Sequence, residues 1–149
     1  MLKKIFKNQK GITLVELLAV IVILGIIALI AVPAIANVIE DSRYDSVKAT
    51  GINIIEAAEL YSVTNNVEDG GVDLADLTGS GYLEGSSLDD WSGDTAVTIN
   101  SDGANTLSGT GTDGNVSVTF SSATVEEINN TDASDLRQGE ASGDVTQGS

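Results

Sequence analysis

The chain has 149 residues, a length that suits one modest domain plus a membrane or targeting segment. It contains no Cys and no His, which excludes disulfides, thiolate zinc sites, cysteine nucleophiles and histidine bases. All 22 acidic residues follow Gly11, where only Arg43, Lys48 and Arg137 are basic. We do not expect the part of the chain after Gly11 to bind nucleic acid directly, because its negative charge repels phosphate backbones.

Residues 1–11 form a short basic leader that carries the other four basic residues, Lys3, Lys4, Lys7 and Lys10. An apolar segment follows directly. Positive charge before an apolar segment predicts that the N-terminus stays cytoplasmic and that the C-terminal part is exported.

Residues 12–39 read ITLVELLAVIVILGIIALIAVPAIANVI, with Glu16 as the only charge. Residues 17–39 correspond to about 34 Å of helix, enough to cross a hydrocarbon core of about 30 Å. The segment therefore predicts a transmembrane helix. The alternative is a cleaved secretory signal peptide, since residues 34–36 resemble a small-x-small cleavage site. Two features argue against a signal peptide: the apolar region is longer than the core of such peptides usually is, and it contains the Glu16 carboxylate.

Residues 40–62 continue as the amphipathic half of the same helix. Apolar and small residues recur at steps of three and four along one stripe: Tyr44, Val47, Gly51, Ile54, Ile55, Ala58 and Tyr61. This pattern predicts one helix from about Ile12 to Ser62. The alternative is two helices with a break near Gly51.

Residues 63–128 predict a small α/β head with antiparallel strands. Turn-rich residues 64–71 end the long helix, and residues 73–77 form a short helical turn. Period-two patterns then predict strands, with turns at 100–103 and 113–115 between them. The expected strands are 96–99, 116–120 and 122–128.

Residues 129–149 are polar and acidic, with Leu136 and Val145 as the only large apolar residues. We expect a flexible acidic tail here.

The junction of leader and apolar segment reads KGITLVE over residues 10–16. It resembles the processing site of type IV prepilins and the related pseudopilins, whose membrane peptidase cuts after the glycine and methylates the new N-terminus. The resemblance covers residues 3–45. It implies cleavage after Gly11 and N-methylation of Ile12, where the family usually has phenylalanine. It also implies an α+β type IV pilin fold, in which a long N-terminal helix packs on a small antiparallel sheet.

Glu16 falls where the family keeps a glutamate, at the fifth mature position. A carboxylate at the edge of a membrane span is costly and is therefore a functional candidate. Cleavage after Gly11 creates an α-amino group four residues before Glu16. Pairing Glu16 with the N-terminus of a neighbouring subunit would offset desolvation and favour one axial register. The alternative is a solvated carboxylate at headgroup depth, favoured by the helix dipole.

Gly25 and Pro33 carry a second resemblance. Pro33 removes one hydrogen bond of the helix and predicts a kink. In filaments of related pilins the backbone between the matching glycine and proline is often unwound. The alternative is a tolerated kink in a membrane helix.

Asp89, Asp90 and Asp94 surround Trp91 and are the candidates for a calcium loop, since some pseudopilins bind calcium. Their spacing matches no established calcium motif, and solvated loop carboxylates are the simpler interpretation.

These features predict a structural subunit of a type IV pilus-like surface filament, not an enzyme, and no cofactor is expected. The expected partners are further copies of the chain, prepilin peptidase, the inner-membrane assembly machinery and, before assembly, membrane lipid. The chain would cross the cytoplasmic membrane once and then enter an extracellular pilus. The alternatives are a pseudopilin of a type II secretion or competence system and a signal-anchored extracellular binding module.

Overall fold

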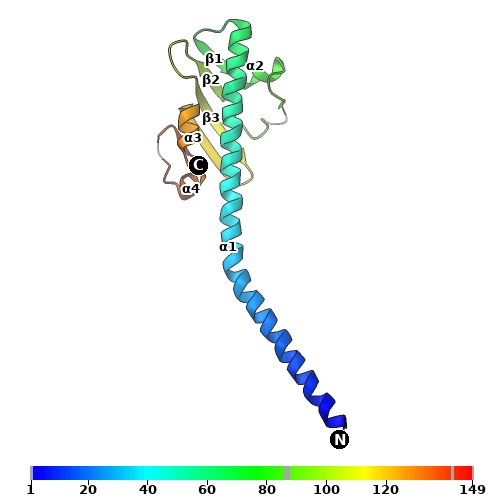
Figure 1. Cartoon of the computed structure of the whole chain (residues 1–149). Helices are drawn as coiled ribbons and strands as arrows, with labels where there is room; N and C mark the ends of the chain where they lie inside the picture. The colour runs from blue at the N-terminus through cyan, green and yellow to red at the C-terminus, as the bar shows by residue number, and fades with distance from the viewer. Residues whose placement is uncertain (1, 86–87, 142, 149) are drawn as a thin grey trace. The chain divides into compact units, whose positions relative to one another are not determined.

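The computed structural model describes residues 2–85, 88–141 and 143–148, with side chains from residue 13 onward. The chain divides into two compact units, which we call the span (Met1–Ile39) and the head (Glu40–Ser149). Helix α1 (Leu2–Asn65) supplies the described part of the span and the first element of the head. Figure 1 shows the helices and strands along the chain.

The amphipathic stripe of α1 is confirmed within the head. Six of its seven residues are buried, and Tyr61 is half-buried. The helix runs three residues beyond the predicted end at Ser62, and Asn66 then takes a left-handed φ of 55°. The amide of Val67 donates to the carbonyl of Ser62 at 3.0 Å, which closes the helix end in the way that left-handed Asn or Gly residues often do.

The head contains one antiparallel sheet of five strands whose spatial order follows the sequence order. Antiparallel neighbours that follow one another in the chain can be joined by short turns. The expected turns at 100–103 and 113–115 are both present and join the second strand to the third and the third to the fourth. Gly114 in the second turn has a φ of 64°, which glycine adopts at little cost. The strands are β1 (Gly70–Asp73), β2 (Ala96–Ile99), β3 (Thr106–Asp113), β4 (Val116–Thr124) and β5 (Val145–Gln147).

The predicted α+β fold is therefore confirmed: the head half of α1 packs on a small antiparallel sheet, consistent with the type IV pilin fold. Strands β2 and β4 lie where the period-two pattern indicates. Helix α2 (Leu74–Gly79) follows the expected helical turn.

The expected third strand at 122–128 is wrong. Strand β4 continues to Thr124, and α3 (Val125–Asn130) follows. The Thr124 side chain accepts a hydrogen bond from the Glu127 amide, while the Glu127 carboxylate accepts from the Thr124 amide at 2.8 Å. This capping box satisfies amides that a helix start otherwise leaves unpaired, and it stops the strand at Thr124.

The flexible tail expected at 129–149 is also not what the described residues show. They form the end of α3, helix α4 (Ala133–Gln138) and strand β5, which pairs with β4. Leu136 is 0% exposed and Val145 is 1% exposed. Two apolar side chains thus fix the segment, because both reach the core.

Two glycines allow a close approach inside the head. A Cβ on Gly51 of α1 would lie 3.1 Å from Leu107 and 3.3 Å from Phe120. A Cβ on Gly111 of β3 would lie 2.7 Å from the Trp91 ring, which stacks on Phe120 with ring centroids 5.5 Å apart. Gly51 therefore serves helix–sheet contact rather than a break in the helix.

Candidate assembly site

Within the part of the chain that the structure describes, the large apolar side chains of the span are not covered. Every large apolar side chain from Leu14 to Ile39 is between 51% and 78% exposed. By length and composition this part of α1 is able to cross a membrane. Such a surface in water would be strongly unfavourable, so the span requires lipid or another protein around it.

The predicted processing residues lie just before the described side chains. Gly11 and Ile12 are helical in backbone, and their side chains lie outside the described residues. Cleavage after Gly11 and methylation of Ile12 stay predictions.

Glu16 is exposed on α1, one turn after Ile12. Among the described residues, the ion pairs join Lys48 to Asp45 and Arg137 to Asp41, so Glu16 has no cation beside it there.

Residues 6–32 match the family model for the prokaryotic N-terminal methylation motif. The chain carries the type IV prepilin signature. The match covers Gly11, Ile12, Glu16 and Gly25 and ends one residue before Pro33. No curated protein and no solved structure gives a match.

Gly25 and Pro33 both lie inside continuous α1. Apart from its chain neighbours and the nearby backbone of the helix, no described atom lies within 4 Å of the position that a Gly25 Cβ would take. The helix is not unwound between these two residues in the single chain. A role for this segment in an extended filament therefore stays a prediction.

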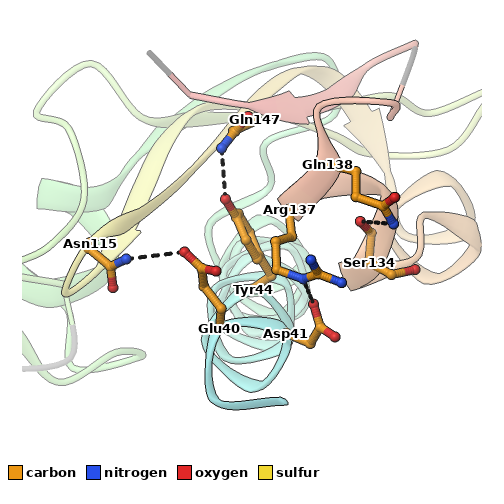
Figure 2. A network of polar contacts seen from close by, with 8 residues as sticks. All are labelled: Glu40, Asp41, Tyr44, Asn115, Ser134, Arg137, Gln138 and Gln147. Atoms are coloured by element: carbon orange, nitrogen blue, oxygen red, sulfur yellow. Dashed lines mark hydrogen bonds and ion pairs between the residues drawn. The ribbon is translucent and has the colours of Figure 1, made fainter. Parts of the chain in front are cut away.

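In the head, side chains from the turn between β3 and β4, from α4 and from β5 converge on the part of α1 that follows Ile39 (Figure 2). Asn115 donates to Glu40 at 3.2 Å, Arg137 of α4 to Asp41 at 2.7 Å, and Gln147 of β5 to the Tyr44 hydroxyl at 3.0 Å. We call these six residues the anchor network. It ties the end of the chain to the helix without a disulfide.

All three basic residues of the head make contacts between α1 and the segments packed on it. Arg43 donates to the Asn115 side chain, and Lys48 donates to the Thr131 carbonyl and lies 3.5 Å from Asp45. Arg137 pairs with Asp41, as described above. The contacts with Asn115, Thr131 and Asp41 could not be predicted from the sequence, because each joins residues 72 to 96 positions apart.

Asp89, Asp90 and Asp94 are all exposed. The Asp90 carbonyl accepts hydrogen bonds from Thr112, which fixes the loop backbone beside β3. Over the described residues, no three acidic side chains gather closely enough to hold a metal ion. The geometry therefore adds no support for a calcium loop.

Proposed function

We propose that the chain is a structural subunit of a type IV pilus-like surface filament that polymerises through its N-terminal helix. The observation that carries this proposal is the methylation motif together with an apolar helix whose large side chains from Leu14 to Ile39 are all more than half exposed. A folded head with its own core accompanies it. Such a subunit is stored in the membrane and exchanges lipid for the helices of other copies.

Processing supplies the chemistry that starts assembly. Prepilin peptidase would cut the peptide bond after Gly11 and methylate the amine of Ile12. The amine stays a cation after a single methylation. It would lie four residues before Glu16, about 6 Å along the helix axis.

The paired charges explain how subunits select one position in the filament. Within an apolar bundle, the carboxylate of Glu16 would be left without water unless a cation approaches it. The N-terminus of the neighbouring subunit supplies that cation. Since each subunit carries both groups, the pairing repeats along the filament and favours a single axial offset.

The processing step is tested by mass spectrometry of the N-terminus in filaments sheared from cells. We expect a chain that begins with N-methylated Ile12. A chain that begins at Asn37 would instead establish the secretory signal peptide.

Gly11→Leu tests whether processing is required. We expect this variant to insert in the membrane, retain its leader and form no filaments, because the peptidase needs a residue without a side chain there. Gly25→Leu is the matched control for the same change within the apolar helix, and it should still be cleaved. Cleavage of the Gly11→Leu chain at the original bond would contradict the proposal.

A further inference from the structure

The head surface carries almost uncompensated negative charge. It contains 21 carboxylates and three basic residues, a net charge of −18. Seventeen of these carboxylates are exposed and none is buried. A neighbouring copy of the head therefore meets many more acidic groups than basic ones.

The three cations of the head are not available to a neighbour. Arg43, Lys48 and Arg137 are each only partly exposed, and each already contacts a group of its own head. Turning one of them outward would release a contact that holds α1 to the rest of the head. Carboxylates of one subunit consequently cannot be neutralised by basic side chains of the next.

Polymerisation would bring these surfaces close together. A head of 110 residues has a radius of gyration of about 13 Å. Heads joined to packed helices lie side by side, so their surfaces approach within the screening length of about 10 Å at 0.1 M salt. At about 0.01 M salt that length is about 30 Å, and repulsion reaches across whole heads.

We infer that the filament is held against charge repulsion between its heads and that dissolved salt stabilises it by screening. This inference rests on the proposed function. Screening here is diffuse, because the described residues offer no group of three metal ligands for a specific ion. The partner of this surface is the mobile cation atmosphere, which NaCl alone supplies.

The test uses sheared filaments of the full processed chain in a fixed concentration of mild non-ionic detergent. NaCl is varied from about 0.01 to 0.5 M, a range over which the screening length falls several-fold. The readout is the fraction of subunits that sediments on ultracentrifugation, with electron microscopy of the pellet. We expect that fraction to rise with NaCl.

A triple variant separates screening from a general salting-out of apolar surface. Asp89→Asn, Asp90→Asn and Asp94→Asn together remove three exposed charges and should shift the sedimentation curve to lower NaCl. The matched control changes the same three residues to Glu, which retains the charge, and should follow the unmodified chain.

Sedimentation that does not depend on NaCl, or coincident curves for the Asn and Glu triples, would overturn the inference. So would a requirement for Mg²⁺ or Ca²⁺ that NaCl does not replace. Absence of filaments at every salt concentration would instead refute the proposed function, and the inference with it.

Discussion

The span and the head handle apolar surface in opposite ways. In the span, every large apolar side chain from Leu14 to Ile39 is more than half exposed. In the head, 19 described apolar residues are at most 8% exposed and form one cluster. The same helix, α1, supplies side chains to both arrangements.

This difference means that the head can fold by itself, whereas the apolar surface of the span is buried only by surroundings outside the chain. Burial of the head core stabilises the head by itself, at about 25 cal/mol per Å² of apolar surface removed from water. The span gains that energy only from lipid or from other copies. A change in the head core should therefore alter unfolding, whereas a change of the apolar residues of the span should alter filament formation.

The strongest test of this separation is a truncated chain that begins at Glu40. It should lose membrane association and filament formation entirely, yet stay soluble, monomeric and folded, because it keeps the whole core. Without disulfides we expect only modest stability. Circular dichroism and gel filtration measure this, and a random-coil spectrum would show that the head depends on the span.

Glu16→Gln should abolish filaments while leaving cleavage and the folded head unchanged. Removing one partner of a buried ion pair costs about 3–5 kcal/mol, and here the loss repeats at every subunit. Pilus number and length are measured by electron microscopy. The matched control is Glu56→Gln, the same substitution on the exposed face of α1 in the head. Normal filaments in the Glu16 variant would refute the pairing mechanism.

Leu136→Ala should lower the free energy of unfolding of the head by about 2–5 kcal/mol, because it leaves a cavity beneath α4. Leu60→Ala is the matched control on α1. Its side chain is 59% exposed, so we expect a change within about 0.5 kcal/mol. Urea unfolding of the truncated chain measures both, and equal effects would contradict an ordered C-terminal segment.

Gly111→Ala should destabilise the head by about 1–3 kcal/mol, because the new methyl group would lie 2.7 Å from Trp91 and 2.9 Å from Val47. Trp91 is the only tryptophan, so its fluorescence reports the displacement directly. Gly79→Ala, where no other atom lies within 4 Å, is the control. Unchanged fluorescence and stability in the Gly111 variant would show that strand β3 moves away without cost.

The smallest effect is expected from the capping box. The Thr124 amide and hydroxyl donate to Glu127 and hold the pKa of its carboxyl below the usual value. The stability that Glu127 contributes is therefore present above the pKa of the unfolded chain and is lost as pH falls through the lower folded pKa. Thermal unfolding of the head should show this loss on acidification below about pH 4.3.

Glu127→Gln should flatten that part of the pH profile, since glutamine maintains the box without titrating. Glu126→Gln, one residue earlier on the exposed face of α3, should not. Identical profiles for the two variants would exclude Glu127 as the origin of the effect.

The long helix and its buried stripe could be predicted from the sequence because both depend on a pattern along one segment. Strand β3 could not, since Leu107 is its only large apolar residue. Its fit depends on Trp91 and α1, which cover Gly111 and lie far away in the chain. The order of the C-terminal segment could not be predicted for the same reason. Its two large apolar side chains are enough to hold it once α4 and β5 place them in the core, which is built from residues far away in the chain.

For the residues proposed to act in assembly, prediction from the sequence is limited in a different way. The motif at residues 6–32 identifies the processing region from sequence. We propose that the partner of Glu16 belongs to another copy, and a single chain cannot show such a pairing. The anchor network depends on contacts between distant residues that no local pattern predicts.

The anchor network also sets the order of events during synthesis. Tyr44 receives its hydrogen bond from Gln147, 103 residues later. At translation rates of about 5–20 residues per second, the ribosome needs about 5–20 s to make that interval. The apolar helix is complete throughout this time, whereas the head still lacks its last strand. If the span enters the membrane as it is made, insertion precedes closure of the head, and a ribosome stalled before Val145 would leave an anchored chain with an unfinished fold.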